Sequence, residues 1–142
     1  MSLVFFTDRD LGNVFPDILA EGGLRVERHR DHFSPDCADE EWLRTVGERD
    51  WIAVTHDTRI RYKPNELAAV IRHRVVLLVV IGKVQHAELA RNFVNTAPKI
   101  EAFLDRHKPP LIAKVHRPLA TDLTRNPGAT GTVSLWYPKH HR

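Results

Sequence analysis

Acidic residues gather at three places in the 142-residue sequence, each beside an apolar run or at the start of a helix-like segment. Carboxylates held at close range repel one another, so they stay ionised together at neutral pH only with a cation among them. Mg²⁺ and Mn²⁺ are the ions that sites made of oxygen ligands prefer. One or two such ions beside a phosphodiester could activate a water and stabilise the leaving oxygen. The acids are Asp8 with Asp10, Asp39 with Glu40 and Glu41, and Asp57.

Three cations, Arg59, Arg61 and Lys63, follow the last of these acids at alternate positions. We predict that they hold the phosphate backbone of a nucleic acid substrate. Each feature also has a purely structural explanation. Acids in the first turn of a helix are favourable against its dipole, Asp is common in turns after strands, and alternating cations protect an exposed sheet edge from aggregation. The functional interpretation depends on the three features occurring together.

The elements that must position these residues are predicted from hydrophobic periodicity. A proline inside the last predicted helix, Pro98, is expected to kink or split it. Strands that alternate with helices indicate an α/β fold with three layers, α/β/α, around a mostly parallel central sheet. The predicted strands are 3–6, 24–29, 51–56, 75–81 and 111–115, and the predicted helices are 11–19, from 39, from 64, and 87–107, with a loop over 32–38.

In folds of this kind, ligands bind beyond the carboxyl ends of the strands. Asp8 and Asp57 each come just after a predicted strand. Because parallel strands end at the same edge of their sheet, we expect both side chains in one crevice.

The composition is that of an ordinary globular protein, with 42% hydrophobic and 27% charged residues. No run approaches the ~20 apolar residues of a membrane span, and the N-terminus lacks the features of a signal peptide. The single cysteine, Cys37, excludes an internal disulfide and fits a reducing compartment. We therefore expect a cytoplasmic protein without membrane association.

The C-terminal part of the chain is basic. From Arg106 onward the sequence contains seven Lys or Arg residues and a single acid, Asp122. Such an excess attracts nucleic acid or an acidic partner protein. Turn-forming residues dominate after residue 116 until the run 133–137, which we expect to be an edge strand or a partner-binding tail.

Three segments of the chain, FFTDRDL, ADEEWL and AVTHDTRI, resemble the PIN-domain nucleases, specifically the compact PIN-like domains of VapC-type toxins. The resemblance covers about residues 3–82. It implies a divalent-metal-dependent endoribonuclease that uses Mg²⁺ or Mn²⁺ and acts as the toxin of a toxin–antitoxin pair. Carried over by position, the metal ligands are Asp8, Asp39 and Asp57, and Thr55 orients the last acid or its water.

On this interpretation, residues 1–116 are a PIN-like nuclease domain and residues 117–142 are a basic C-terminal extension. Larger PIN toxins carry a further acid on helices that precede the position of Asp39. Here that region is only the loop 30–37. The candidates to replace the missing acid are Glu40, which we take as a supporting metal ligand, Asp10 and Glu66.

The resemblance also implies partners. An RNA is the expected substrate, and an antitoxin is expected to bury the acidic crevice and insert a basic residue among its acids. Because dimerisation is common in the family, we expect a homodimer.

Two other interpretations stay open. One is a catalytically inactive PIN-like module that binds RNA or protein. The other is a receiver-like phosphoacceptor domain in which Asp57 would be phosphorylated. That class needs a hydroxyl residue after the fourth strand and a Lys after the fifth, whereas Lys83 follows the fourth strand and Lys114 lies inside the fifth.

Overall fold

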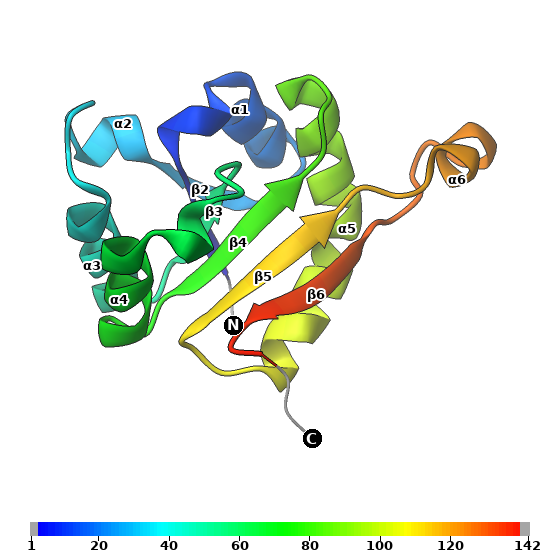
Figure 1. Ribbon diagram of the computed structural model, residues 1–142. Helices are drawn as coiled ribbons and strands as arrows, with labels where there is room; N and C mark the ends of the chain where they lie inside the picture. Colours follow the sequence, from blue (N-terminus) through cyan, green and yellow to red (C-terminus); the bar gives the residue numbers. More distant parts are fainter. Residues whose placement is uncertain (1–2, 140–142) are drawn as a thin grey trace.

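The computed structural model describes residues 3–139 and consists of one six-stranded sheet with helices on both faces (Figure 1). Arg142, one of the basic residues counted above, lies outside this range. The strands are β1 (Val4–Thr7), β2 (Arg25–Arg28), β3 (Ile52–Thr55), β4 (Val76–Ile81), β5 (Leu111–His116) and β6 (Thr132–Tyr137). The helices are α1 (Val14–Glu21), α2 (His29–His32), α3 (Asp39–Glu48), α4 (Pro64–Arg72), α5 (His86–Arg106) and α6 (Ala120–Arg125), and η1 (Arg9–Leu11) and η2 (Ile60–Tyr62) are short 3-10 turns.

The strand order in the sheet is β2-β1-β3-β4-β5-β6. Strands β1 to β5 run parallel, and β6 pairs antiparallel with β5 at the edge. The chain therefore moves outward in one direction from β1 to β2 and in the other from β3 onward. That reversal makes the carboxyl ends of β1 and β3 the switch point at which doubly wound sheets bind ligands. The predicted three-layer α/β/α architecture with a mostly parallel sheet is confirmed.

Alternating side chains divide the core into two layers. In β1, Phe5 packs in the layer under α1 and α5, and Phe6 packs in the layer under α3 and α4. Strand residues alternate between faces with a period of two, so one apolar strand supplies both layers. The central strand β4, VLLVVI, is buried on both faces and is apolar throughout, as expected for a covered parallel strand.

Two details of the helices differ from the expectation. Helix α5 is not split at Pro98: it is one helix over His86–Arg106, and its apolar side is buried at Phe93, Ile100 and Phe103 on both sides of the proline. Burial of that face offsets the roughly 3 kcal/mol that an internal proline costs. A one-turn helix, α2, also occupies residues where a strand end and a loop were expected.

The C-terminal segment adds α6 and β6. None of the residues of α6 is buried, and Figure 1 shows this helix standing away from the sheet. Strand β6 extends the sheet as an edge strand, and its approach to β5 depends on Gly131. A Cβ atom there would lie 1.7 Å from the carbonyl oxygen of His116. The N–H of Gly131 donates to Thr96 Oγ1 of α5 at 2.9 Å, which ties the start of β6 to that helix.

Within residues 3–139, no helix combines the length and the apolar character needed to cross a membrane.

Candidate active site

Two acids converge on one hydroxyl at the switch point of the sheet. Asp8 directly follows β1, and its N–H still pairs with the Val54 carbonyl oxygen of β3 at 3.0 Å. The η1 turn then brings Asp10 back toward the end of β3. There the buried Thr55 Oγ1 lies 2.9 Å from Asp8 Oδ2 and 3.1 Å from Asp10 Oδ2. A hydroxyl has one proton to donate, so it cannot satisfy both carboxylates at once.

The remaining contacts of this acid pair are to backbone N–H groups. Asp8 accepts from the N–H of Arg9 at 2.8 Å, and Asp10 accepts from the N–H of His56 at 3.0 Å. No Lys, Arg or His side chain among residues 3–139 forms an ion pair with either carboxylate. The pair is therefore held in position without being neutralised.

The pKa values of both acids reflect that environment. Burial, followed by the charge of Asp10, raises the pKa of Asp8 to about 6. Desolvation of the carboxyl group also raises the pKa of Asp10, although this residue is exposed as a whole. The pair thus carries an energetic cost for its full negative charge, and a bound cation would relieve it.

Asp39 is the first residue of α3. Its Oδ1 accepts from Trp42 Nε1 at 2.9 Å, which fixes the carboxylate against its own helix. Its negative charge contributes to the raised pKa of Asp8.

Asp57 follows β3, and its charge is already compensated. Its Oδ2 lies 2.7 Å from Lys63 Nζ, and its Oδ1 accepts from the N–H of Arg59 at 2.9 Å. Burial alone would raise the pKa of Asp57, but the bonds from Lys63 and Arg59 and the charges of both cations lower it. The charge of Asp57 in turn contributes to the raised pKa of Asp10.

Two residues proposed from the sequence lie in other environments. Glu40 pairs with Arg72 of α4 at 3.0 Å, so its carboxylate bridges α3 and α4. Arg61 donates to the Trp136 carbonyl oxygen at 3.2 Å, and its guanidinium lies over the rings of Trp136 and Tyr137. Glu40 is thus engaged with a neighbouring helix and Arg61 with the edge strand β6.

A family model described as a PIN like domain matches residues 3–82, which is more than half of the chain. The chain belongs to the PIN-like domain family. Searches of curated proteins and of solved structures gave no match. The matched segment ends at Gly82, just after β4, so it contains the whole acidic crevice of the PIN-like domain. Helices α5 and α6 and strands β5 and β6 lie outside it.

The fit of a metal to the PIN-like domain follows from the donor set. Across residues 3–139, no three His, Cys, Asp or Glu side chains are grouped closely enough to hold a metal ion. Asp8 and Asp10, which form no ion pair within the described residues, nevertheless suit Mg²⁺ or Mn²⁺, because Mg²⁺ commonly keeps several waters and binds through one or two carboxylates. These two residues could hold such an ion.

Sequence reasoning named Asp10 only as one of three candidates to replace a missing acid, whereas the structure brings it to Thr55 beside Asp8. The repeated acid in Asp8-Arg9-Asp10 is the only signal that could have raised its rank. The signal is weak, because the 3-10 turn that brings both acids to Thr55 does not follow from the residue types.

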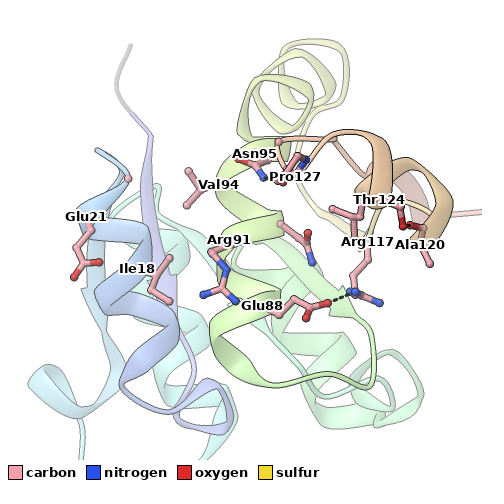
Figure 2. Close-up of a pocket in the computed structure, with 14 residues that line it drawn as sticks. Ile18, Glu21, Glu88, Arg91, Val94, Asn95, Arg117, Ala120, Thr124 and Pro127 are labelled. Atoms are coloured by element: carbon pink, nitrogen blue, oxygen red, sulfur yellow. Dashed lines mark hydrogen bonds and ion pairs between the residues drawn. The ribbon is translucent and has the colours of Figure 1, made fainter.

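A cavity of the described chain lies away from these acids. It measures about 1060 Å³ and lies between α1, α5 and α6 (Figure 2). Arg91 of α5 points into it, and Arg117 borders it while paired with Glu88. None of the acids of the crevice lines this cavity.

Proposed function

We propose that this PIN-like domain is a divalent-metal-dependent endoribonuclease that hydrolyses RNA phosphodiesters. One observation carries the proposal: Asp8 and Asp10 converge on the Thr55 hydroxyl at the switch point of the sheet, and neither carboxylate forms an ion pair within the described chain. Membership of the PIN-like family supports it, because PIN domains are in general nucleases.

Each residue near the acid pair has a proposed role. Asp8 and Asp10 would hold Mg²⁺ or Mn²⁺, and Asp39 and Asp57 would add to the negative field around it. When bound, the ion would supply charge neutralisation and Lewis acidity at the phosphodiester. Thr55 and the N–H of His56 orient the two principal carboxylates.

The biological role that we propose is the toxin of a toxin–antitoxin pair. The support is the resemblance of three sequence segments to VapC-type toxins, together with two acids, Asp8 and Asp10, that form no ion pair within the described chain. A basic side chain of an antitoxin would complement those acids as a metal ion does. We further propose a homodimer, on the resemblance alone.

A second candidate is an inactive PIN-like module that binds RNA or protein. Its support is that no three potential ligands are grouped for a metal within residues 3–139. The receiver-like alternative shares the strand order 2-1-3-4-5. Against it, the Lys114 ammonium of β5 lies over the Trp136 ring at 4.3 Å, and Lys63 and Arg59 already occupy the Asp57 carboxylate.

Cleavage of a mixed RNA pool by the purified protein tests the proposal. We expect cleavage with Mg²⁺ or Mn²⁺, none with EDTA, and loss of cleavage in Asp8→Asn and Asp10→Asn. Asp122→Asn in the exposed helix α6 makes the same charge change away from the crevice and should retain full activity. A folded wild-type protein that is inert with both metals would contradict the nuclease and favour the binding module.

A further inference from the structure

A second cavity adjoins the acid pair on the side of the sheet where β2 lies. It measures about 440 Å³ and opens at the carboxyl ends of β1 and β2. Its walls are mainly polar, and Asp8 belongs both to them and to the crevice. The other charged or polar side chains that line it include Arg9, Asn13, Arg28, His29 and Arg30.

Arg9 is oriented toward this cavity by neutral partners. Its Nε donates to His29 Nδ1 at 2.8 Å, and one Nη donates to the Phe33 carbonyl oxygen at 2.7 Å. His29 is only 3% exposed and packs against Phe6, Phe33 and Trp42, so it is a rigid acceptor. Burial and the charge of Arg9 lower the pKa of His29, which keeps the imidazole neutral. Arg9 is thus fixed in position and keeps its full positive charge.

Arg30 repeats this arrangement. Its Nη1 donates to Asn13 Oδ1 at 2.6 Å, again a neutral acceptor. Neither Arg9 nor Arg30 forms an ion pair with an acid within residues 3–139, whereas Arg28 pairs with Asp17 at 2.6 Å.

Two other cations near the carboxyl ends of the strands already have an acid. Lys63 pairs with Asp57, and Arg117 pairs with Glu88. A guanidinium that is oriented but not neutralised is suited to a phosphate, which accepts two parallel hydrogen bonds from its planar fork. The cavity beside Asp8 brings two such groups together.

We propose that this arginine-lined cavity binds a backbone phosphate of the RNA strand, next to the phosphodiester that is cleaved at Asp8 and Asp10. This inference rests on the proposed function. Asp8 lines both the crevice and the cavity, so a strand with its reacting phosphate at the acids places an adjoining phosphate among the arginines. Arg9 and Arg30 contact that phosphate, and His29 is a positioning residue for Arg9.

Binding of short, fluorescently labelled single-stranded RNA in EDTA tests this without cleavage. Arg9→Gln and Arg30→Gln should each weaken binding about 5- to 10-fold and make the dependence of log K on log salt shallower by about 0.7, the value of one lost phosphate contact. The matched control is Arg72→Gln, since Arg72 is exposed and paired with Glu40; it should bind as the wild type does. His29→Phe keeps an aromatic side chain but removes the acceptor, and should weaken binding with the same change in slope.

A set of oligonucleotides with one neutral methylphosphonate linkage, moved along the strand, identifies the phosphate. One position should weaken binding to the wild type, weaken it less in Arg9→Gln, and have no effect on the double variant Arg9→Gln/Arg30→Gln, because both contacts are then already lost. Inorganic phosphate serves as a competitor, and weak competition at millimolar concentration supports a backbone phosphate rather than a free anion. Additive losses at every linkage, or affinities unchanged in Arg9→Gln and Arg30→Gln, would overturn the proposal and point to an acidic partner protein.

The outcomes separate the two proposals. Metal-dependent cleavage with unchanged RNA binding in the arginine variants would leave the nuclease standing and overturn the phosphate site. Binding that depends on Arg9 and Arg30 in a protein that cleaves no RNA would support the phosphate site and overturn the nuclease.

Discussion

Two aspartates follow neighbouring parallel strands, yet their surroundings give them opposite electrostatics. Asp8 after β1 has no cationic partner among the described residues, and its pKa is raised to about 6. Asp57 after β3 is held by Lys63, and its pKa is lowered. Residue type and position relative to the sheet therefore do not tell which of the two carboxylates already has a cationic partner in the protein and which could bind a metal ion. Burial raises the pKa of Asp8, whereas at Asp57 the bonds and charges of Lys63 and Arg59 outweigh the effect of burial.

The two turns differ in where they send their cations. After β3, the chain passes through η2 and brings Lys63 back to the Asp57 carboxylate at 2.7 Å. After β1, the cation between the two acids, Arg9, is directed instead to His29 at the end of β2. One turn neutralises its acid, and the other separates negative and positive charge into adjacent sites.

The largest expected effect is on RNA cleavage. Asp10→Asn should lower kcat/KM in Mn²⁺ by more than about 100-fold, because it removes a principal ligand, whereas Asp57→Asn should lower it by about 10-fold, as for a supporting residue. Single-turnover cleavage of one RNA by both variants measures the difference. Equal losses would mean that Asp57 leaves Lys63 and serves as a full ligand.

The next effect is stabilisation by metal. Mn²⁺ at 100 times its Kd should raise the free energy of unfolding by about 2.7 kcal/mol. We expect this in the wild type and in Asp57→Asn but not in Asp8→Asn, and thermal unfolding with and without Mn²⁺ measures it. A shift that persists in Asp8→Asn would place the ion elsewhere.

The pH dependence of stability should distinguish the two aspartates. Because the folded-state pKa of Asp8 is about 6, above its usual value of 3.8, the folded protein binds the proton more tightly than the unfolded chain does. The unfolding free energy of the metal-free protein should therefore fall as pH rises from about 4 to about 7. Asp8→Asn should remove about 1–2 kcal/mol of this fall.

Urea unfolding of both proteins in EDTA at several pH values measures that difference. Asp57 has the opposite sign, since its lowered pKa gives stability that is present above about 3.8 and lost as pH falls below it. Parallel pH profiles of the wild type and Asp8→Asn would show that Asp8 titrates as it does in the unfolded chain.

The smallest effect concerns the Lys63–Asp57 pair, which is partly exposed. Lys63→Met should cost no more than about 1 kcal/mol of stability. The same substitution should also raise the pKa of Asp57, because it leaves this carboxylate without an ion pair, as Asp8 is. A carboxyl titration by NMR measures the pKa, and an unchanged value would show that the backbone N–H of Arg59 alone sets it.

Much of the fold was accessible to sequence reasoning. Apolar strands that alternate with amphipathic helices predicted the layers and the parallel sheet, since the periods of 2 and 3.6 residues are local properties. The same hydrophobic periods predicted where β1 and β3 end, and therefore that Asp8 and Asp57 come just after these strands. The continuity of α5 through Pro98 could not be predicted, because it depends on how much apolar surface the sheet buries on either side of the proline.

For the acidic crevice, the sequence by itself determined which acids reach one edge of the sheet, because a parallel strand carries its following residue there. Only the tertiary structure decided which acids meet a cation. Asp10 and Thr55 are 45 residues apart, and Arg9 and His29 are 20 residues apart. These contacts depend on the strand order and on the course of two short turns. Charge compensation acts over a few ångströms between groups distant in the chain, and no local pattern of residues encodes it.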